Sequence, residues 1–168
     1  MAKKTKIAKK VRAARMKDFV EDSDGFSLLA ICSAEPDVRM AWLLNRALHL
    51  DFVRRTPDLC GREPDEWQQQ RTPLDGEKPE QAQLFAVFCA VSSVLRRTYI
   101  LVTNRQGGEL LIKELANVDY LLKIQEALPD DELTALGEAI RNIPDVPACI
   151  VITDDKIKSN PLLASLEV

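Results

Sequence analysis

The sequence predicts an α+β domain: a mostly antiparallel sheet of about five to six strands, with two main helices packed on one face. Three observations support this prediction. Apolar runs of strand length recur along the chain between turn residues, and two other stretches have apolar residues at helical spacing. The chain has 168 residues, 46% of them hydrophobic and 29% charged, which is ordinary for one globular domain.

The first part of the sequence predicts a strand followed directly by a helix. Residues 26–32 form a short apolar run between turn residues, which is typical of a buried strand. Residues 33–37 then supply capping side chains and a proline, which favour the start of a helix. Between Val38 and Leu50 the apolar side chains are spaced to form one buried stripe: Met40, Leu43, Leu44, Ala47 and Leu48.

Residues 52–54 are predicted to form a brief strand, and residues 56–82 a long loop. The loop contains four prolines, two glycines and many charged residues. A connection of this length in a compact domain is usually functional or disordered. Trp67 is its one aromatic residue, and we expect it to pin the loop to the domain.

The centre of the chain predicts a hairpin. Residues 84–91 are apolar at successive positions, as in a central strand, and residues 97–103 form the antiparallel mate. Residues 104–108 form a turn whose glycines allow positive φ. A third strand is expected at 109–112.

The last third of the chain predicts strand, helix, strand. Residues 118–124 alternate so that Val118, Tyr120, Leu122 and Ile124 share one face. A helix opens at 129–132, where acidic residues suit its positive end, and it stops at Pro144. A final strand is expected at 148–152. The remaining apolar residues are predicted to dock as a short helix: Leu162, Leu163 and Leu166.

The charge is unevenly distributed along the chain. Residues 1–17 carry a net charge of +8, and the remainder holds 15 basic and 26 acidic residues, a net charge of −11. We therefore expect a flexible basic arm at 1–17 and a single domain over 18–168. The arm could bind phosphates of nucleic acid, attract an anionic membrane surface, or remain a solvated tail. Its eight cations are Lys3, Lys4, Lys6, Lys9, Lys10, Arg12, Arg15 and Lys17.

The residues that usually build metal and nucleophile sites are sparse. There is one histidine, His49, and the four cysteines show no C-x-x-C spacing. Cys32, Cys89 and Cys149 lie in apolar runs and are expected to fill the core, whereas Cys60 lies in a polar stretch. Neither of the common glycine-rich phosphate-binding motifs occurs. No metal or cofactor is expected.

Residues 112–120 resemble the signature of a bacterial family named for its Ile-Pro-Glu-x-x-x-Val-Asp-Tyr motif. Lys113 stands where the family has proline, and the resemblance extends over most of residues 25–160. It implies a small cytoplasmic bacterial protein of unknown function and carries no catalytic residue. The five matching positions are Ile112, Glu114, Val118, Asp119 and Tyr120.

Glu114 and Asp119 are the best candidate pair of acids. Paired carboxylates can divide acid and base roles when their environments separate their pKa values. No nucleophile or metal-ligand cluster accompanies them in the sequence. We therefore favour a structural role in which both accept backbone N–H bonds where the chain turns.

The leading functional hypothesis is a non-enzymatic binding or regulatory module that engages a protein partner. A nucleic-acid accessory protein acting through the basic arm is the alternative, and an enzyme using Glu114 and Asp119 comes third. Association with further copies of the chain is compatible with the sequence. No apolar stretch is long enough to predict a transmembrane segment or a secretory signal, so the cytoplasm is the expected location.

Overall fold

The computed structural model describes residues 25–61 and 83–167. Its main element is a six-stranded sheet in the order β2-β3-β4-β7-β1-β8, with every neighbouring pair antiparallel. The α+β prediction is confirmed. The six strands are β1 (Ser27–Cys32), β2 (Val53–Cys60), β3 (Leu84–Ser92), β4 (Arg97–Thr103), β7 (Tyr120–Ile124) and β8 (Ala148–Val151).

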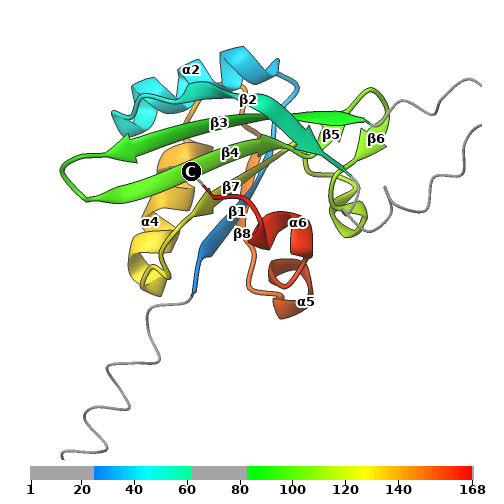
Figure 1. Ribbon diagram of the computed structural model, residues 1–168. Helices are drawn as coiled ribbons and strands as arrows, with labels where there is room; N and C mark the ends of the chain where they lie inside the picture. The colour runs from blue at the N-terminus through cyan, green and yellow to red at the C-terminus, as the bar shows by residue number, and fades with distance from the viewer. Residues whose placement is uncertain (1–24, 62–82, 168) are drawn as a thin grey trace, which may run out of the picture.

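Two helices cover one side of the sheet, here called the helix-covered face (Figure 1). They are α2 (Asp37–Leu48) and α4 (Asp130–Arg141). Their apolar stripes meet the side chains of alternate strand residues in one buried cluster, which includes Leu29, Met40, Leu101, Leu122 and Ile140. Both helices occupy the stretches where helical spacing predicted them.

The other side of the sheet, here called the opposite face, is covered by two irregular stretches. One is residues 104–119, here called the crossing segment, which holds the short β5 (Arg105–Gln106), β6 (Glu109–Leu110) and the 3₁₀ turn η1 (Lys113–Leu115). The other is residues 154–167, the C-terminal segment, with α5 (Asp155–Lys158) and α6 (Pro161–Ala164). Leu163 and Leu166 are buried there, as the predicted short helix required.

A lysine holds the C-terminal segment on the sheet. Lys123 points from β7 toward the opposite face and is only 4% exposed. Its Nζ donates to the carbonyls of Leu163 and Leu166, each at 2.8 Å, and lies 4.6 Å from the centre of the Phe26 ring. The Leu163 carbonyl also accepts the Leu166 N–H at 3.3 Å, so the ammonium group adds a charged donor that ties α6 and the residues after it to β7.

Three local predictions were wrong. The strand expected at 52–54 continues to Cys60, so residues 56–60 belong to the sheet and not to a loop. The strand expected at 109–112 pairs only in the small β5–β6 ribbon. Val118 packs on the opposite face whereas Tyr120 packs on the helix-covered face, because regular strand alternation starts only at Tyr120.

Some predictions concern residues outside the described part of the chain. They include the basic arm at 1–17, residues 62–82 of the predicted loop, and Trp67. Within the described ranges, the helices are too short or too polar to traverse a lipid bilayer.

Candidate functional site

The crossing segment, which carries the family-like motif, is organised around one buried amide. Asn104 is fully buried, and its Nδ2 donates to the carbonyls of Leu115 and Val118, both at 2.9 Å. Its Oδ1 accepts the Ile112 N–H at 2.8 Å. An asparagine side chain offers two donors and an acceptor, and all of these atoms are engaged with the backbone. Asn104 therefore fixes the path of the segment.

Asp119 ties the end of the crossing segment to the end of β1. Its Oδ2 accepts the Ser33 backbone N–H at 2.9 Å, and Oδ1 lies 3.5 Å from Arg105 Nε. The Asp119 N–H donates to the Ile31 carbonyl at 3.1 Å. This is the backbone-holding role that the sequence favoured for Asp119. The Arg105 guanidinium also donates to the Ala116 carbonyl, which closes the same turn.

The other acid of the candidate pair has a different environment. Glu114 lies in η1 and is exposed, and no hydrogen bond from a described residue reaches its carboxylate. The backbone bonds expected for Glu114 are thus missing from the described part of the chain. η1 turns this side chain outward, whereas the apolar Leu111, Ile112 and Val118 around it are buried.

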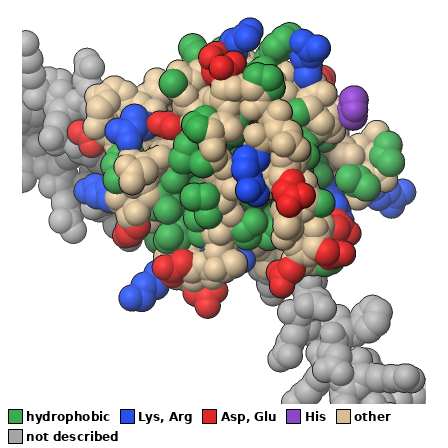
Figure 2. Space-filling model, turned by 180° about the vertical axis from the view of Figure 1, so that it is seen from behind, with side chains coloured by type: hydrophobic (Ala, Val, Ile, Leu, Met, Phe, Trp, Pro, Cys, Tyr) green, Lys and Arg blue, Asp and Glu red, His purple; other side chains and the backbone are tan. Residues whose placement is uncertain are grey.

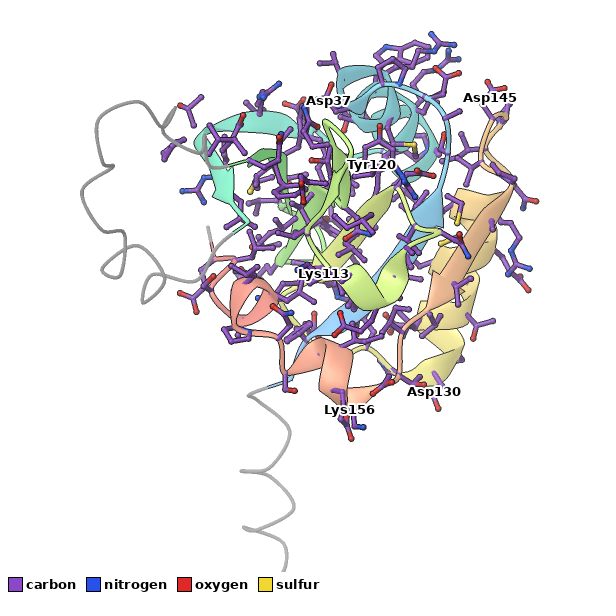
Figure 3. All side chains as sticks on the ribbon, turned by 90° about the vertical axis from the view of Figure 1, so that its right-hand side faces the viewer. Asp37, Lys113, Tyr120, Asp130, Asp145 and Lys156 are labelled. Carbon is purple, nitrogen blue, oxygen red and sulfur yellow. The ribbon has the colours of Figure 1, made fainter. Side chains whose placement is uncertain are left out.

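Tyr120 is buried with its hydroxyl at the start of α2 (Figure 3). The hydroxyl donates to the Glu35 carbonyl. Burial, together with the nearby carboxylates of Asp37, Asp119 and Glu35, raises the pKa of Tyr120 to about 12. The hydroxyl is a fixed structural donor, and its raised pKa makes it a poor proton donor at neutral pH.

The residues that could supply metal or nucleophile chemistry are not gathered. Among the described residues, no group of three histidine, cysteine or acidic side chains could hold a metal ion. Burial raises the pKa of Cys32 and Cys89, and that of Cys149 to about 11, which disfavours their thiolates. His49 is exposed at the left-handed C-cap of α2.

The outward side of α2 carries a different set of side chains, here called the Arg–Trp–Arg surface: Arg39, Trp42 and Arg46. Trp42 is 45% exposed, although the ring of a tryptophan is usually largely buried. The guanidinium carbons of Arg39 and Arg46 lie 5.3 and 4.8 Å from the centre of the Trp42 ring. These positions fall at i, i+3 and i+7, which places them on one side of the helix.

The two arginines differ in their ionic partners. Arg39 pairs with Glu35 at 3.1 Å, but its side chain is 53% exposed, so the pair contributes little to stability. No described carboxylate lies within ion-pair distance of Arg46. The surface therefore keeps positive charge available beside an exposed aromatic ring.

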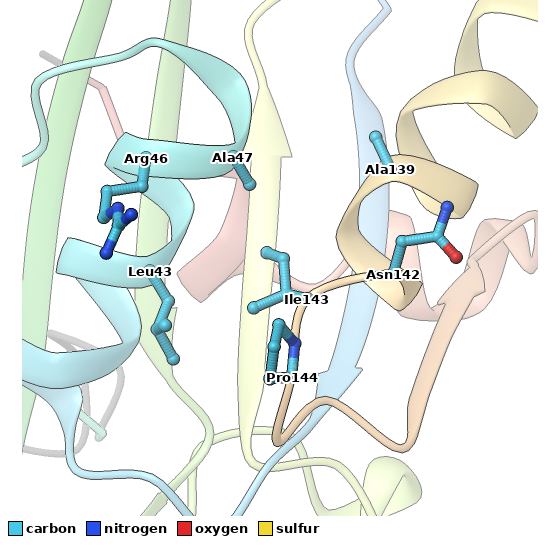
Figure 4. Close-up of a pocket in the computed structure, with 7 residues that line it drawn as sticks. All are labelled: Leu43, Arg46, Ala47, Ala139, Asn142, Ile143 and Pro144. Atoms are coloured by element: carbon cyan, nitrogen blue, oxygen red, sulfur yellow. The ribbon is translucent and has the colours of Figure 1, made fainter.

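An open groove of about 450 Å³ adjoins this surface, between α2 and the end of α4. Leu43 and Ala47 face Ala139, Ile143 and Pro144 across it (Figure 4). Arg46 and Asn142 are its polar lining residues, so Arg46 belongs to both the groove and the Arg–Trp–Arg surface. Figure 2, which looks at this side of the molecule, shows hydrophobic side chains gathered on it with charged ones among them.

The functional residues predicted from the sequence do not include this surface. Arg39 and Arg46 fall outside the buried stripe predicted for α2, but that position alone assigns them no role. The available signal was the tryptophan between two arginines at helical spacing, outside the apolar stripe. The groove itself depends on how α2 and α4 meet, which local sequence does not encode.

Comparison of the chain with protein-family models, with curated proteins and with solved structures found no match.

Proposed function

We propose that this protein is a non-enzymatic binding module that holds a segment of a partner protein on the outward side of α2 and α4. The observation that carries the proposal is Trp42, 45% exposed between two guanidinium groups, one of which, that of Arg46, also lines an apolar groove. Tryptophan and arginine are the residue types that most often dominate the binding energy of protein interfaces.

The chemistry of this surface defines the partner segment. An apolar side chain fits the groove, whose volume of about 450 Å³ is in the range of ordinary ligand pockets. Carboxylates beside that side chain suit Arg39 and Arg46, because a guanidinium binds a carboxylate through two parallel hydrogen bonds. The expected ligand is therefore an acidic segment with a bulky apolar anchor.

An enzymatic role for Glu114 and Asp119 has weaker support. The Asp119 carboxylate is engaged by the Ser33 amide and by Arg105, and Glu114 is exposed. We also propose membership of the family with the Ile-Pro-Glu-x-x-x-Val-Asp-Tyr signature. Its support is that the matching residues fold as one segment, in which Ile112 and Val118 are buried and Asp119 and Tyr120 bond to the backbone.

Selection from a phage-displayed peptide library tests the binding proposal, because the library samples many candidate partner segments at once. Wild-type protein should enrich peptides that place an apolar residue next to aspartate or glutamate. Trp42→Ala should weaken the enriched peptides at least tenfold in a fluorescence titration. Arg46→Glu should do the same and should itself select lysine-containing or arginine-containing peptides.

Val94→Ala is the matched control, since Val94 is 89% exposed in the β3–β4 turn and outside the proposed surface. It should leave affinity unchanged. Enrichment of peptides without acidic residues, or equal binding by Trp42→Ala and wild type, would overturn the proposal.

Nucleic-acid binding is the second candidate, and the charge of +8 on residues 1–17 is the observation that favours it. Binding of labelled DNA should then fall steeply between about 50 and 200 mM salt, because phosphate contacts release counterions. Deletion of residues 1–17 should abolish it. Binding that survives the deletion would exclude the arm as the site.

A further inference from the structure

The two edges of the sheet are built differently. The β2 edge carries Arg54, Arg55 and Pro57, and its register shifts between Arg55 and Leu59. Charges, proline and irregular register are the usual means by which an edge strand resists pairing with another chain. Arg54 is further occupied by ion pairs to Asp37 and Asp58.

The β8 strand itself contains no charged residue, no proline and no shift of register. Residues 146–153 contain no charged side chain, and Pro147 precedes the strand. Ile150, in the middle of β8, is 53% exposed. In Figure 3 this strand runs down the side of the molecule from Asp145, at the end of the sheet order. An uncharged, regular edge with an exposed β-branched residue is open to strand addition.

The register shows which backbone groups of β8 face outward. The Ile152 N–H donates to the Leu28 carbonyl, so the even-numbered residues of this stretch bond inward to β1. Successive residues of a strand direct their N–H and C=O groups to opposite sides. The N–H and C=O groups of Cys149 and Val151 therefore face outward, and no described residue outside the β1–β8 pair hydrogen-bonds to them.

We propose that a second copy of this chain pairs with β8, forming an antiparallel two-fold contact centred on Ile150. Cys149 of each copy then lies opposite Val151 of the other, and their outward N–H and C=O groups form four hydrogen bonds. The two Ile150 residues face each other as a non-hydrogen-bonded pair. The two sheets join into one continuous sheet of twelve strands.

The argument for a second copy, over a different protein, is that this edge is complementary to itself. The outward groups sit symmetrically on either side of Ile150, and no like charges meet when the strand is paired with its own copy. The strand has four residues, so the contact is small and the dimer should depend on protein concentration.

The first test is the mass of the full-length protein in solution, measured by light scattering across a concentration series. The dimer fraction should rise with concentration. Ile150→Lys should remain monomeric at concentrations where wild type dimerises, because lysines would meet at the two-fold axis. Since Ile150 is exposed, this variant should keep the wild-type circular dichroism spectrum.

The second test is oxidative cross-linking of Ile150→Cys. Non-hydrogen-bonded pairs place their Cα atoms about 4.5 Å apart, within the range that a disulfide spans. A covalent dimer should form in Ile150→Cys well above the background of wild type and of Val94→Cys, a control at a more exposed position. Monomeric wild type throughout the series, or a dimer that Ile150→Lys leaves intact, would overturn the proposal. Equal cross-linking of Val94→Cys and Ile150→Cys would do so too.

Discussion

The two faces of the sheet are covered by different means. On the helix-covered face, α2 and α4 satisfy their own backbone hydrogen bonds and contribute mainly apolar side chains to the core. The opposite face is covered by irregular chain, whose backbone groups need partners when buried. Asn104 and Lys123 supply those partners, and both are buried. The difference explains why the buried amide and the buried ammonium group both lie on the opposite face.

This difference also separates structural chemistry from binding chemistry. On the opposite face, the side chains of Asn104, Arg105 and Asp119 in the crossing segment are bonded to backbone within the fold. On the helix-covered side, the outward surface of α2 presents Trp42 and Arg46 to solvent. Of the residues that resemble a family signature, Ile112 and Val118 are thus buried, Asp119 and Tyr120 are bonded to backbone, and Glu114 is exposed, and the proposed binding surface lies elsewhere.

The largest predicted effect is the loss of Asn104. Asn104→Ala removes three side-chain hydrogen bonds and leaves the Ile112 amide and the Val118 carbonyl without a partner among the described residues, while the Leu115 carbonyl keeps the Val118 N–H. Each buried polar group left unpaired costs ~1–3 kcal/mol, so the free energy of unfolding should fall by about 3 kcal/mol or more. Urea denaturation measures it. Gln106→Ala, in the same segment, is the control and should change little.

Asp119→Ala is expected to have the next largest effect. It removes the acceptor of the Ser33 amide and the partner of Arg105, for a loss of about 2 kcal/mol. The thermal midpoint should drop by several degrees, whereas Glu114→Ala should leave it unchanged because Glu114 is exposed. Equal midpoints for Asp119→Ala and wild type would show that this carboxylate does not hold the turn.

Lys123→Met should loosen the C-terminal segment with a smaller overall loss, about 1.5 kcal/mol. The methionine preserves apolar packing but leaves the carbonyls of α6 without the ammonium donor. Hydrogen exchange should accelerate over residues 155–167 and stay unchanged in β3 and β4. An equal acceleration of hydrogen exchange in β3, β4 and residues 155–167 would contradict a local role for Lys123.

The difference in stability between wild type and Lys123→Met should depend on pH. Burial lowers the pKa of Lys123 below its ordinary value of 10.5. Between that lowered value and 10.5 the unfolded chain binds more protons than the folded one, so stability rises with pH there. The free energy of unfolding of wild type, relative to that of Lys123→Met, should therefore rise as the pH approaches 10.5. It should fall again as the pH is lowered below the pKa of Lys123 in the folded state. A constant difference would contradict the burial of a charged group.

The smallest effect is expected for Tyr120→Phe, which removes one hydrogen bond to the Glu35 carbonyl and should cost about 1 kcal/mol. Because the pKa of Tyr120 is raised to about 12, its contribution is present below the unfolded value of 10.0 and lost as the pH rises toward 12. Unfolding measured at pH 8 and pH 11.5 should show wild type losing its advantage over Tyr120→Phe.

The regular elements could be predicted from the sequence because their signals are local. The spacing of Met40, Leu43 and Leu44 in α2 and the apolar run of β3 reflect the burial that the structure has. For the opposite face, the docking of the C-terminal leucines was predicted, but the polar contacts that hold its covering segments were not. The partners of Lys123 lie 40 or more residues away, and nothing near Lys123 marks it as buried. In the sequence, Asn104 looks like an ordinary turn residue. Its role could not be predicted because the backbone groups that bond its side chain come from later positions in the chain.

The candidate surface was also only partly predictable. The sequence placed Arg39 and Arg46 off the buried stripe of α2, which the structure bears out. The groove depends on Ala139, Ile143 and Pro144 meeting α2 across nearly a hundred residues of chain. An apolar stripe predicts that a helix packs against the core. It does not predict the angle between two packed helices, which determines whether a groove lies between them.

The most direct test of the account is the affinity of one library-selected acidic peptide for three proteins: wild type, Trp42→Ala and Asp119→Asn. It should be measured at a temperature where circular dichroism shows all three to be folded. Binding should be at least tenfold weaker for Trp42→Ala and within twofold of wild type for Asp119→Asn. Full affinity in Trp42→Ala, with a loss in Asp119→Asn, would contradict it by placing the binding site at the crossing segment.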